Sequence, residues 1–236
     1  MTTTPDVQQL LGLRTPPVAI AFLAEPPANL RRWSGPPQPA GCAFWQKAHA
    51  GEAFYTVAAD HFGCAVGAYT HAIELPAERS AQLGETIDLM VGTGYLKREE
   101  VPGIPRLAQS PAVVAYGPAD RSGFPPDVVL LAANPSQTML IYEAALRSGA
   151  GQPLANLLGR PSCGVLPLTL KSGEAAVSVG CAGNRLYAGL QESEMYVSIP
   201  GTKWEAFKAR LVEIVDANQR MGEYYTRHEA EVRGGA

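Results

Sequence analysis

Two stretches of the chain repeat one pattern of cysteine, glycine and small residues, and this repeat constrains the fold more than any other sequence feature. Cys42 is followed nine residues later by Gly-Glu-Ala, then by a β-like run and a Gly-Cys-Ala turn at Cys64. Cys163 is followed ten residues later by Gly-Glu-Ala, then by a β-like run and a Gly-Cys-Ala turn at Cys181. The segments PVAIAFLAEPP and DVVLLAANPSQ also correspond, 110 residues apart. Four matches in the same order predict a duplicated α/β unit.

Hydrophobic periodicity supports this fold class. Short β-branched or aromatic runs bounded by Gly or Pro predict strands, and apolar spacings of three and four predict helices. We therefore expect an α/β fold, with α+β as its variant, in which two similar half-units, residues 1–110 and 111–236, pack with pseudo-twofold symmetry around a mixed sheet in one globular unit. The predicted strands are 17–23, 53–59, 112–117, 127–133, 175–180 and 194–200, and the predicted helices are 6–13, 42–50, 135–148 and 202–227.

Charge and hydropathy exclude several classes of partner. The chain has 19 basic and 22 acidic residues and a net charge of −3, without a basic run that could neutralise several phosphates. We therefore expect neither nucleic acid nor a membrane as a partner. The first residues lack a basic and apolar leader pattern, and the longest apolar run, Val128–Ala133, is too short to cross a bilayer. These features predict a cytoplasmic protein.

The four cysteines are the strongest candidates for chemistry. Cytosolic thiols stay reduced, which favours thiols or metal ligands over disulfides. A twofold arrangement of the half-units brings Cys42, Cys64, Cys163 and Cys181 towards one interface, and four thiolates suit an iron–sulfur cluster or zinc. Because the chain has no C-x-x-C pair, we favour a 4Fe-4S cluster, with zinc as the alternative. Free cysteine also packs as a small hydrophobic residue, so a purely structural role for all four stays open.

Several motifs, taken together and in order, resemble the DUF169 family of uncharacterised prokaryotic proteins. They are PVAIAF, GEAF, FGCAVG, PPDVVLLAANPSQTM, GRPSCG and VGCAGNRLYAGLQESEMYVSIPG. The resemblance as a whole covers residues 10–211, and its weakest match lies at 80–105. The resemblance implies that the four cysteines occupy recurring cysteine positions of the family. It also implies that Arg185 and Glu194 match its polar positions, and it implies little about activity.

Three functional classes follow from these residues. The first is a redox or Lewis-acid enzyme with a metal or cluster on the cysteines and a small anionic substrate bound by Arg185, which follows Cys181 by one helical turn. An ion pair of Arg185 with Glu192 or Glu194 is the structural alternative. The second class is a non-catalytic module that binds a metal or small molecule, and the third is a structural protein. An electron-transfer partner and a homo-oligomer stay open, as does a role for residues 94–107 as a lid or a surface connection.

Overall fold

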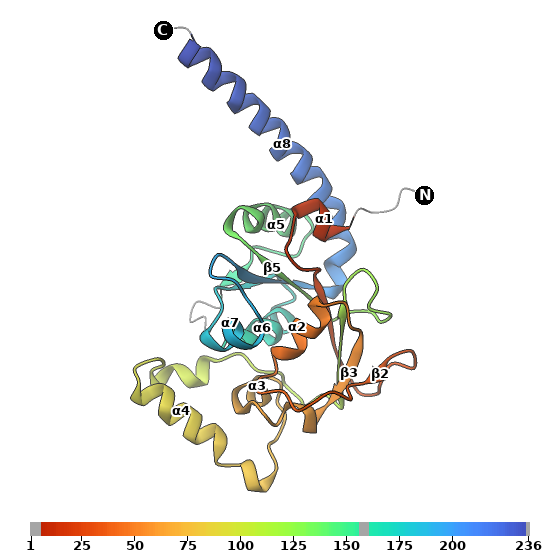
Figure 1. The fold of residues 1–236 in the computed structure, drawn as a ribbon, viewed down its shortest axis with the longest axis vertical. Helices are drawn as coiled ribbons and strands as arrows, with labels where there is room; N and C mark the ends of the chain where they lie inside the picture. Colours follow the sequence, from red (N-terminus) through yellow and green to blue (C-terminus); the bar gives the residue numbers. More distant parts are fainter. Residues whose placement is uncertain (1–5, 156–160, 235–236) are drawn as a thin grey trace.

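The structure is a computed structural model, and it describes residues 6–155 and 161–234 of the 236-residue chain. It has a mixed α/β fold with one central sheet (Figure 1). Among the described residues, eight strands form this sheet in the order β2-β3-β4-β1-β5-β8-β7-β6. The strands are β1 (Val18–Leu23), β2 (Arg31–Arg32), β3 (Phe54–Val57), β4 (Val113–Pro118), β5 (Val128–Ala133), β6 (Leu154–Ala155), β7 (Ala176–Ser178) and β8 (Met195–Pro200).

Eight α-helices and five short 3₁₀ helices join the strands within the described ranges. No helix in those ranges combines the length and apolar character that a membrane span needs. The α-helices are α1 (Val7–Leu11), α2 (Ala43–His49), α3 (Ala65–Thr70), α4 (Gln82–Gly92), α5 (Pro135–Arg147), α6 (Val165–Ser172), α7 (Ala182–Tyr187) and α8 (Trp204–Gly234). The 3₁₀ helices are η1 (Ala58–His61), η2 (Ala77–Arg79), η3 (Arg98–Gly103), η4 (Ser162–Gly164) and η5 (Gly201–Lys203).

The two halves of the sheet are connected in the same way. Each half has a parallel edge pair (β2 with β3, β6 with β7) and antiparallel pairs further in (β3-β4-β1, β7-β8-β5). Their registers also correspond, because Val18 pairs with Pro118 in the first half and Val128 pairs with Pro200 in the second. This shared connectivity and register is what a duplicated unit predicts.

The halves meet at the antiparallel pair β1–β5. Val18 lies opposite Leu130, Ala19 opposite Val129, and Ile20 opposite Val128. With the offset of 110 residues between the halves, Val128 is the counterpart of Val18 and Leu130 the counterpart of Ile20. Val18 therefore faces the counterpart of Ile20, and Ile20 faces the counterpart of Val18, as in an isologous pairing centred on Ala19 and Val129. Superposition of the two halves by a pseudo-twofold axis stays a prediction.

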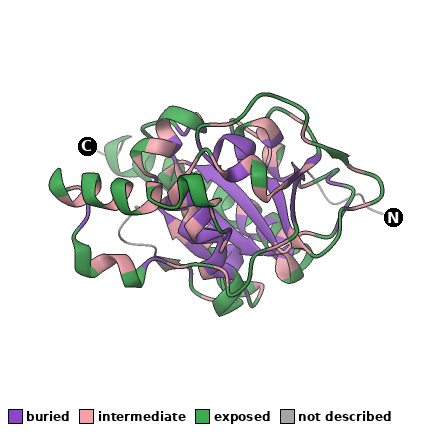
Figure 2. Cartoon of the chain, turned by 90° about the horizontal axis from the view of Figure 1, so that it is seen from below, coloured by how far each residue is buried: buried purple, intermediate pink, exposed green. Residues whose placement is uncertain are grey.

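Both faces of the sheet are covered (Figure 2). Alternate residues of β1, β4 and β5 pack against α2 and α6, with Phe44, Trp45 and Leu166 fully buried in this cluster. The other set of β5 and β8 side chains packs against α1, α5 and α8, with Phe207 and Leu211 fully buried. Because strand side chains alternate between faces, one sheet supports two separate hydrophobic cores.

Local signals placed several elements correctly. All six predicted strands are present; five are shorter than predicted, and β4 is shifted by one residue. Helix α5 begins after Asn134, whose side chain accepts a hydrogen bond from the Gln137 N–H. The Gln137 side chain in turn accepts from the Asn134 N–H, which completes a capping box. Residues 1–5 and 235–236 of the predicted half-units, and residues 159–160 of the GRPSCG motif, lie outside the described residues.

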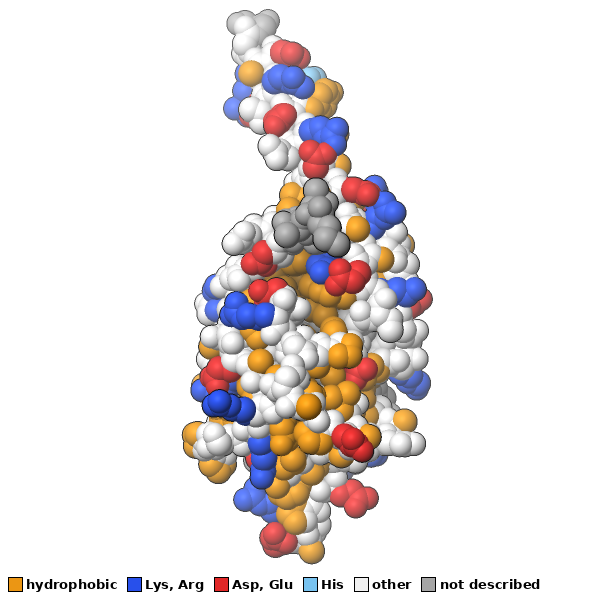
Figure 3. All heavy atoms as spheres, turned by 90° about the vertical axis from the view of Figure 1, so that its right-hand side faces the viewer, with side chains coloured by type: hydrophobic (Ala, Val, Ile, Leu, Met, Phe, Trp, Pro, Cys, Tyr) orange, Lys and Arg blue, Asp and Glu red, His pale blue; other side chains and the backbone are white. Residues whose placement is uncertain are grey.

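The predicted end of the last helix was wrong. Helix α8 runs to Gly234, and every residue from Asp216 to Gly234 is exposed as the helix leaves the body of the molecule (Figure 3). Ion pairs one turn apart, Asp216–Arg220 and Glu229–Arg233, lie along this extension. Such pairs support a helix without a buried face, so apolar periodicity alone did not mark where α8 ends.

The two parts of α8 should respond differently to truncation of an apolar side chain. Leu211→Ala, in the fully buried part, should lower the free energy of unfolding by about 2–5 kcal/mol because it leaves a cavity. Met221→Ala, on the exposed part, should change it by less than about 0.5 kcal/mol. Urea denaturation followed by circular dichroism measures both; equal losses would contradict the packing of α8 described above.

Candidate functional site

The four cysteines lie at the starts of four helices and line one cavity of about 320 Å³. Cys42, Cys64 and Cys181 are the N-cap residues of α2, α3 and α7, and Cys163 lies in η4 directly before α6. All four are free thiols. Since α2 and α3 belong to the first half of the chain and α6 and α7 to the second, the cavity lies between the two half-units.

Two glycines allow the chain to bring cysteines to this cavity. A Cβ atom on Gly63 would lie 2.1 Å from the carbonyl oxygen of Gln38, so the backbone passes too close for any side chain. Gly180 has a φ of 92°, and a Cβ there would also lie 2.5 Å from Leu190. Only glycine adopts this conformation readily, and each glycine directly precedes a cysteine of the cavity.

The sulfur atoms have polar neighbours on their own helices and on facing ones. Cys64 Sγ accepts a hydrogen bond from the Gly67 N–H at 3.2 Å, and Cys163 Sγ accepts from the Thr70 hydroxyl at 3.4 Å. The Cys181 thiol donates to Asn184 Oδ1 at 3.4 Å, and Asn184 also hydrogen-bonds with Cys42. Asn184 is 1% exposed, so one buried amide connects a cysteine of each half.

Burial keeps two of these thiols protonated. It raises the pKa of the Cys42 thiol to about 12 and that of the Cys163 thiol well above its ordinary value. Cys64 and Cys181 add to both shifts, because negative charge on one sulfur disfavours negative charge on another nearby. A thiolate elsewhere in the cavity therefore opposes ionisation of Cys42 and of Cys163.

The four cysteines are of the ligand type that a soft metal prefers, but as arranged in this structure they do not surround a single ion. Within the described part of the chain, no three His, Cys, Asp or Glu side chains are grouped closely enough to hold one metal ion. A zinc site requires four sulfurs at about 2.3 Å from one atom. An iron–sulfur cluster instead distributes its cysteine ligands over several irons.

The segment that connects α3 to β4 forms the opposite wall of the cavity. Side chains from α4 and the following residues line it, among them Ile87, Met90 and Leu96. Tyr95 in this segment accepts a hydrogen bond from the Ala182 N–H at 3.3 Å, and the Leu107 N–H donates to Thr70 at 2.9 Å. Residues 94–107 are thus part of the cavity wall; opening of this wall as a lid stays a prediction.

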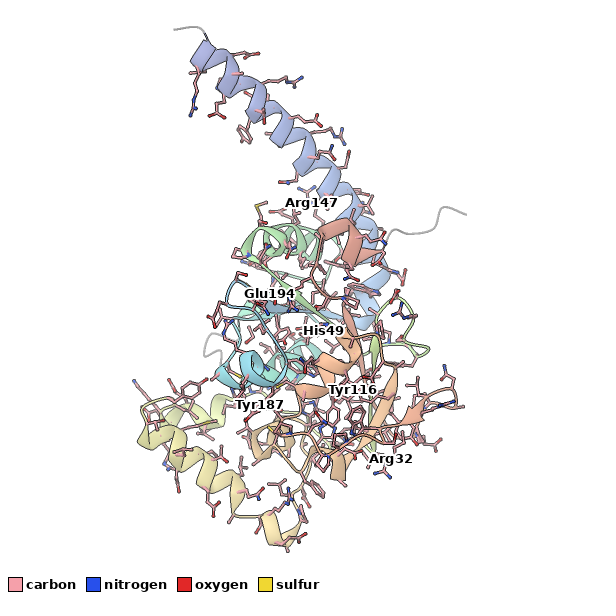
Figure 4. The ribbon with its side chains drawn as sticks, in the orientation of Figure 1. Arg32, His49, Tyr116, Arg147, Tyr187 and Glu194 are labelled. Atoms are coloured by element: carbon pink, nitrogen blue, oxygen red, sulfur yellow. The ribbon has the colours of Figure 1, made fainter. Side chains whose placement is uncertain are left out.

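Arg185 and Glu194 are not among the described residues that line the cavity. The Arg185 guanidinium donates to the carbonyl oxygens of Val179, at 2.9 Å, and Gln191. Glu194 forms a bidentate pair with Arg14 at 2.8 and 3.0 Å, rather than a pair with Arg185. Figure 4 places Glu194 near His49 on the α5 side of α7, whereas Tyr187 lies on the α4 side. Both residues thus hold the loop after α7, and a substrate-binding role for them stays a prediction.

His71 also lines the cavity, although no sequence motif marks it. Its ring stacks on His61 with centroids 5.7 Å apart, and both rings are 2% exposed. Burial lowers the pKa of His61 to about 3 and that of His71 to about 4. The sequence signal that could have identified His71 is its position seven residues after Cys64. It lies at the C-terminal end of α3, a helix too short to be predicted from its apolar pattern.

The cysteines should differ in reactivity in protein that has been treated with a chelator. At about pH 8, iodoacetamide should modify Cys64 and Cys181 well before Cys42 and Cys163, since burial keeps the latter two protonated and only thiolates react. Peptide mass spectrometry over a time course measures the order. Early modification of Cys42 would show that its thiol is not buried as described.

The buried histidines should make stability depend on pH. Both have native pKa values below the ordinary 6.5, so the unfolded chain binds more protons and stability falls as pH drops below about 6.5. At about pH 5 each histidine should cost about 2 kcal/mol relative to neutral pH. Urea unfolding across this pH range measures the loss of unfolding free energy. A His228→Gln control, altered at an exposed site, should lose as much of it as the wild type. A flat profile would contradict the buried neutral pair.

Comparison with known proteins agrees with the motifs. The family profile of DUF169, described as uncharacterised ArCR, matches residues 6–208. The chain is 28% identical over 171 residues to the uncharacterized protein MJ0308 of Methanocaldococcus jannaschii, a match that covers 69% of each chain. No solved structure matches. Because the family match covers more than half of the chain, including all four cysteines, the protein belongs to the DUF169 family.

Proposed function

We propose that the protein binds an iron–sulfur cluster through Cys42, Cys64, Cys163 and Cys181, with zinc as the alternative metal. The observation that carries the proposal is that all four cysteines, from four helix starts in both halves, line one cavity. Cysteine thiolates are the usual ligands of these clusters, and four of them satisfy the common cluster types.

The lining of the cavity favours this proposal over a purely structural role. Cys42 belongs to the hydrophobic core, and Cys64 and Cys163 pack against it, as structural cysteines would. All four cysteines nevertheless line one cavity, and its volume of about 320 Å³ is large enough for a small ligand.

The protonated state of the buried thiols agrees with a site that is completed by metal. A bound metal displaces the thiol protons, and its positive charge offsets the repulsion between the resulting thiolates. When bound, a cluster would supply electron transfer if all its irons have protein ligands, or Lewis acidity if one iron is open. The chain contributes the thiols, the Asn184 amide that connects Cys42 with Cys181, and an apolar wall that limits access of water.

The experiment is metal analysis of the full chain prepared without oxygen. We expect iron, acid-labile sulfide and visible charge-transfer absorbance, and Cys163→Ser or Cys181→Ser should each remove most of the iron. Cys163 and Cys181 are both only partly buried, so either variant keeps the test valid if the other fails to fold. Ser148→Ala, at the end of α5 and not among the residues that line the cavity, is the control and should retain iron.

Two other results would overturn the cluster. Stoichiometric zinc that depends on the same cysteines, without iron, would identify the alternative metal. A folded wild-type chain that retains neither metal, even after reconstitution with iron and sulfide or with zinc, would contradict metal binding altogether. The remaining interpretations would then be a non-catalytic module that binds a small molecule, or a structural protein.

A further inference from the structure

The cavity carries no ionic groups on the walls that the structure describes. Within residues 6–155 and 161–234, no Lys, Arg, Asp or Glu side chain lines it. The wall opposite the cysteines is mainly apolar, with Leu83, Ile87, Met90, Leu96, Val101 and Ile104 from α4 and the segment that follows it. Burying an unpaired charge in such surroundings is costly, so the lining disfavours an anionic or cationic ligand.

His71 gives this apolar cavity one oriented hydrogen-bond acceptor. Its Nδ1 lies 2.8 Å from the carbonyl oxygen of Gly67. A carbonyl only accepts, so Nδ1 carries the proton and Nε2 carries the lone pair. The contact also fixes the ring orientation, because Gly67 lies one helical turn before His71 on α3.

Nε2 of His71 is buried and has no hydrogen-bond partner among the described residues. His71 nevertheless lines the cavity with a ring that is 2% exposed. A buried acceptor without a donor loses its hydration and gains nothing in exchange, and native proteins rarely leave such groups unsatisfied. Because His71 lines the cavity, a hydrogen-bond donor on a molecule bound there would satisfy this acceptor.

We propose that the cavity binds a neutral, mainly apolar small molecule that donates one N–H or O–H hydrogen bond to Nε2 of His71. The proposal assigns a substrate class to the cavity that the four cysteines line. Any chemistry on the bound molecule rests on the proposed function, whereas binding requires only the cavity. The proposal replaces the anionic ligand expected from the sequence with a neutral one. Positioned in this way, the molecule lies in the same cavity as the four cysteines.

Three related probes test the proposal directly on the full chain. Indole is apolar and has one N–H donor, 1-methylindole keeps the shape without the donor, and indole-3-carboxylate adds a negative charge. By calorimetry or ligand-observed NMR, indole should bind about tenfold more tightly than 1-methylindole, because only indole satisfies the buried acceptor. The carboxylate should bind more weakly than indole. This comparison uses the wild-type chain, so it does not depend on the folding of a variant.

A variant then assigns the effect to one side chain. His71→Phe should bind indole and 1-methylindole equally, since it keeps an aromatic ring but removes the acceptor. His228→Phe, changed at an exposed residue of α8, should keep the tenfold preference. Iron content of the same samples should be unchanged in His71→Phe, because His71 is proposed to contact the small molecule and not the metal.

Several other outcomes would overturn the inference. Equal binding of indole and 1-methylindole to the wild type, tightest binding of the carboxylate, or no binding of any probe would refute a neutral donor ligand. Loss of iron in His71→Phe would make His71 a metal ligand instead. If the wild type binds no metal but still prefers indole, the proposed cluster is wrong while this inference stands.

Discussion

The antiparallel pairing of β1 with β5 is the interaction on which the rest of the structure depends. It joins the two halves in a register that sets Val18 opposite Leu130 and Ile20 opposite Val128. A slip of one residue would turn every side chain of one half to the opposite face of the sheet and so disrupt the hydrophobic core on each face. The register therefore decides that α2 and α6 pack on the same face of the sheet, and hence that their cysteines can reach one cavity.

The cavity also depends on a difference between the halves. The first half connects α3 to β4 through residues 71–112, whereas the second connects α7 to β8 through residues 188–194. The longer connection contributes α4 and the residues after it as an apolar wall, tied to α7 by the bond from the Ala182 N–H to Tyr95. Shared connectivity thus supplies the thiols, and the additional segment of one half encloses them.

Much of the fold could be predicted because its strands are buried and strongly patterned. β5, with six consecutive buried residues, and α5, with its Asn134 cap, were identified from local signals alone. The two-residue strands β2 and β6 and the six-residue helices α3 and α7 were not, because so few residues carry no measurable period. Arg185 shows the same limit at the site: its place one turn after Cys181 was correct, but the direction of its guanidinium depends on the loop that supplies the Val179 and Gln191 carbonyls.

The sequence by itself determined the α/β class, the repeated cysteines and the glycines that precede Cys64 and Cys181, because each rests on local chain chemistry that a short pattern records. Only the tertiary structure decided that the four cysteines share a cavity, that its described walls are uncharged, and that His71 presents an unpartnered acceptor there. These properties arise where segments more than 90 residues apart, such as Thr70 and Cys163, come into contact. No local pattern encodes such contacts, since they are fixed by the pairing of strands and the packing of helices upon them.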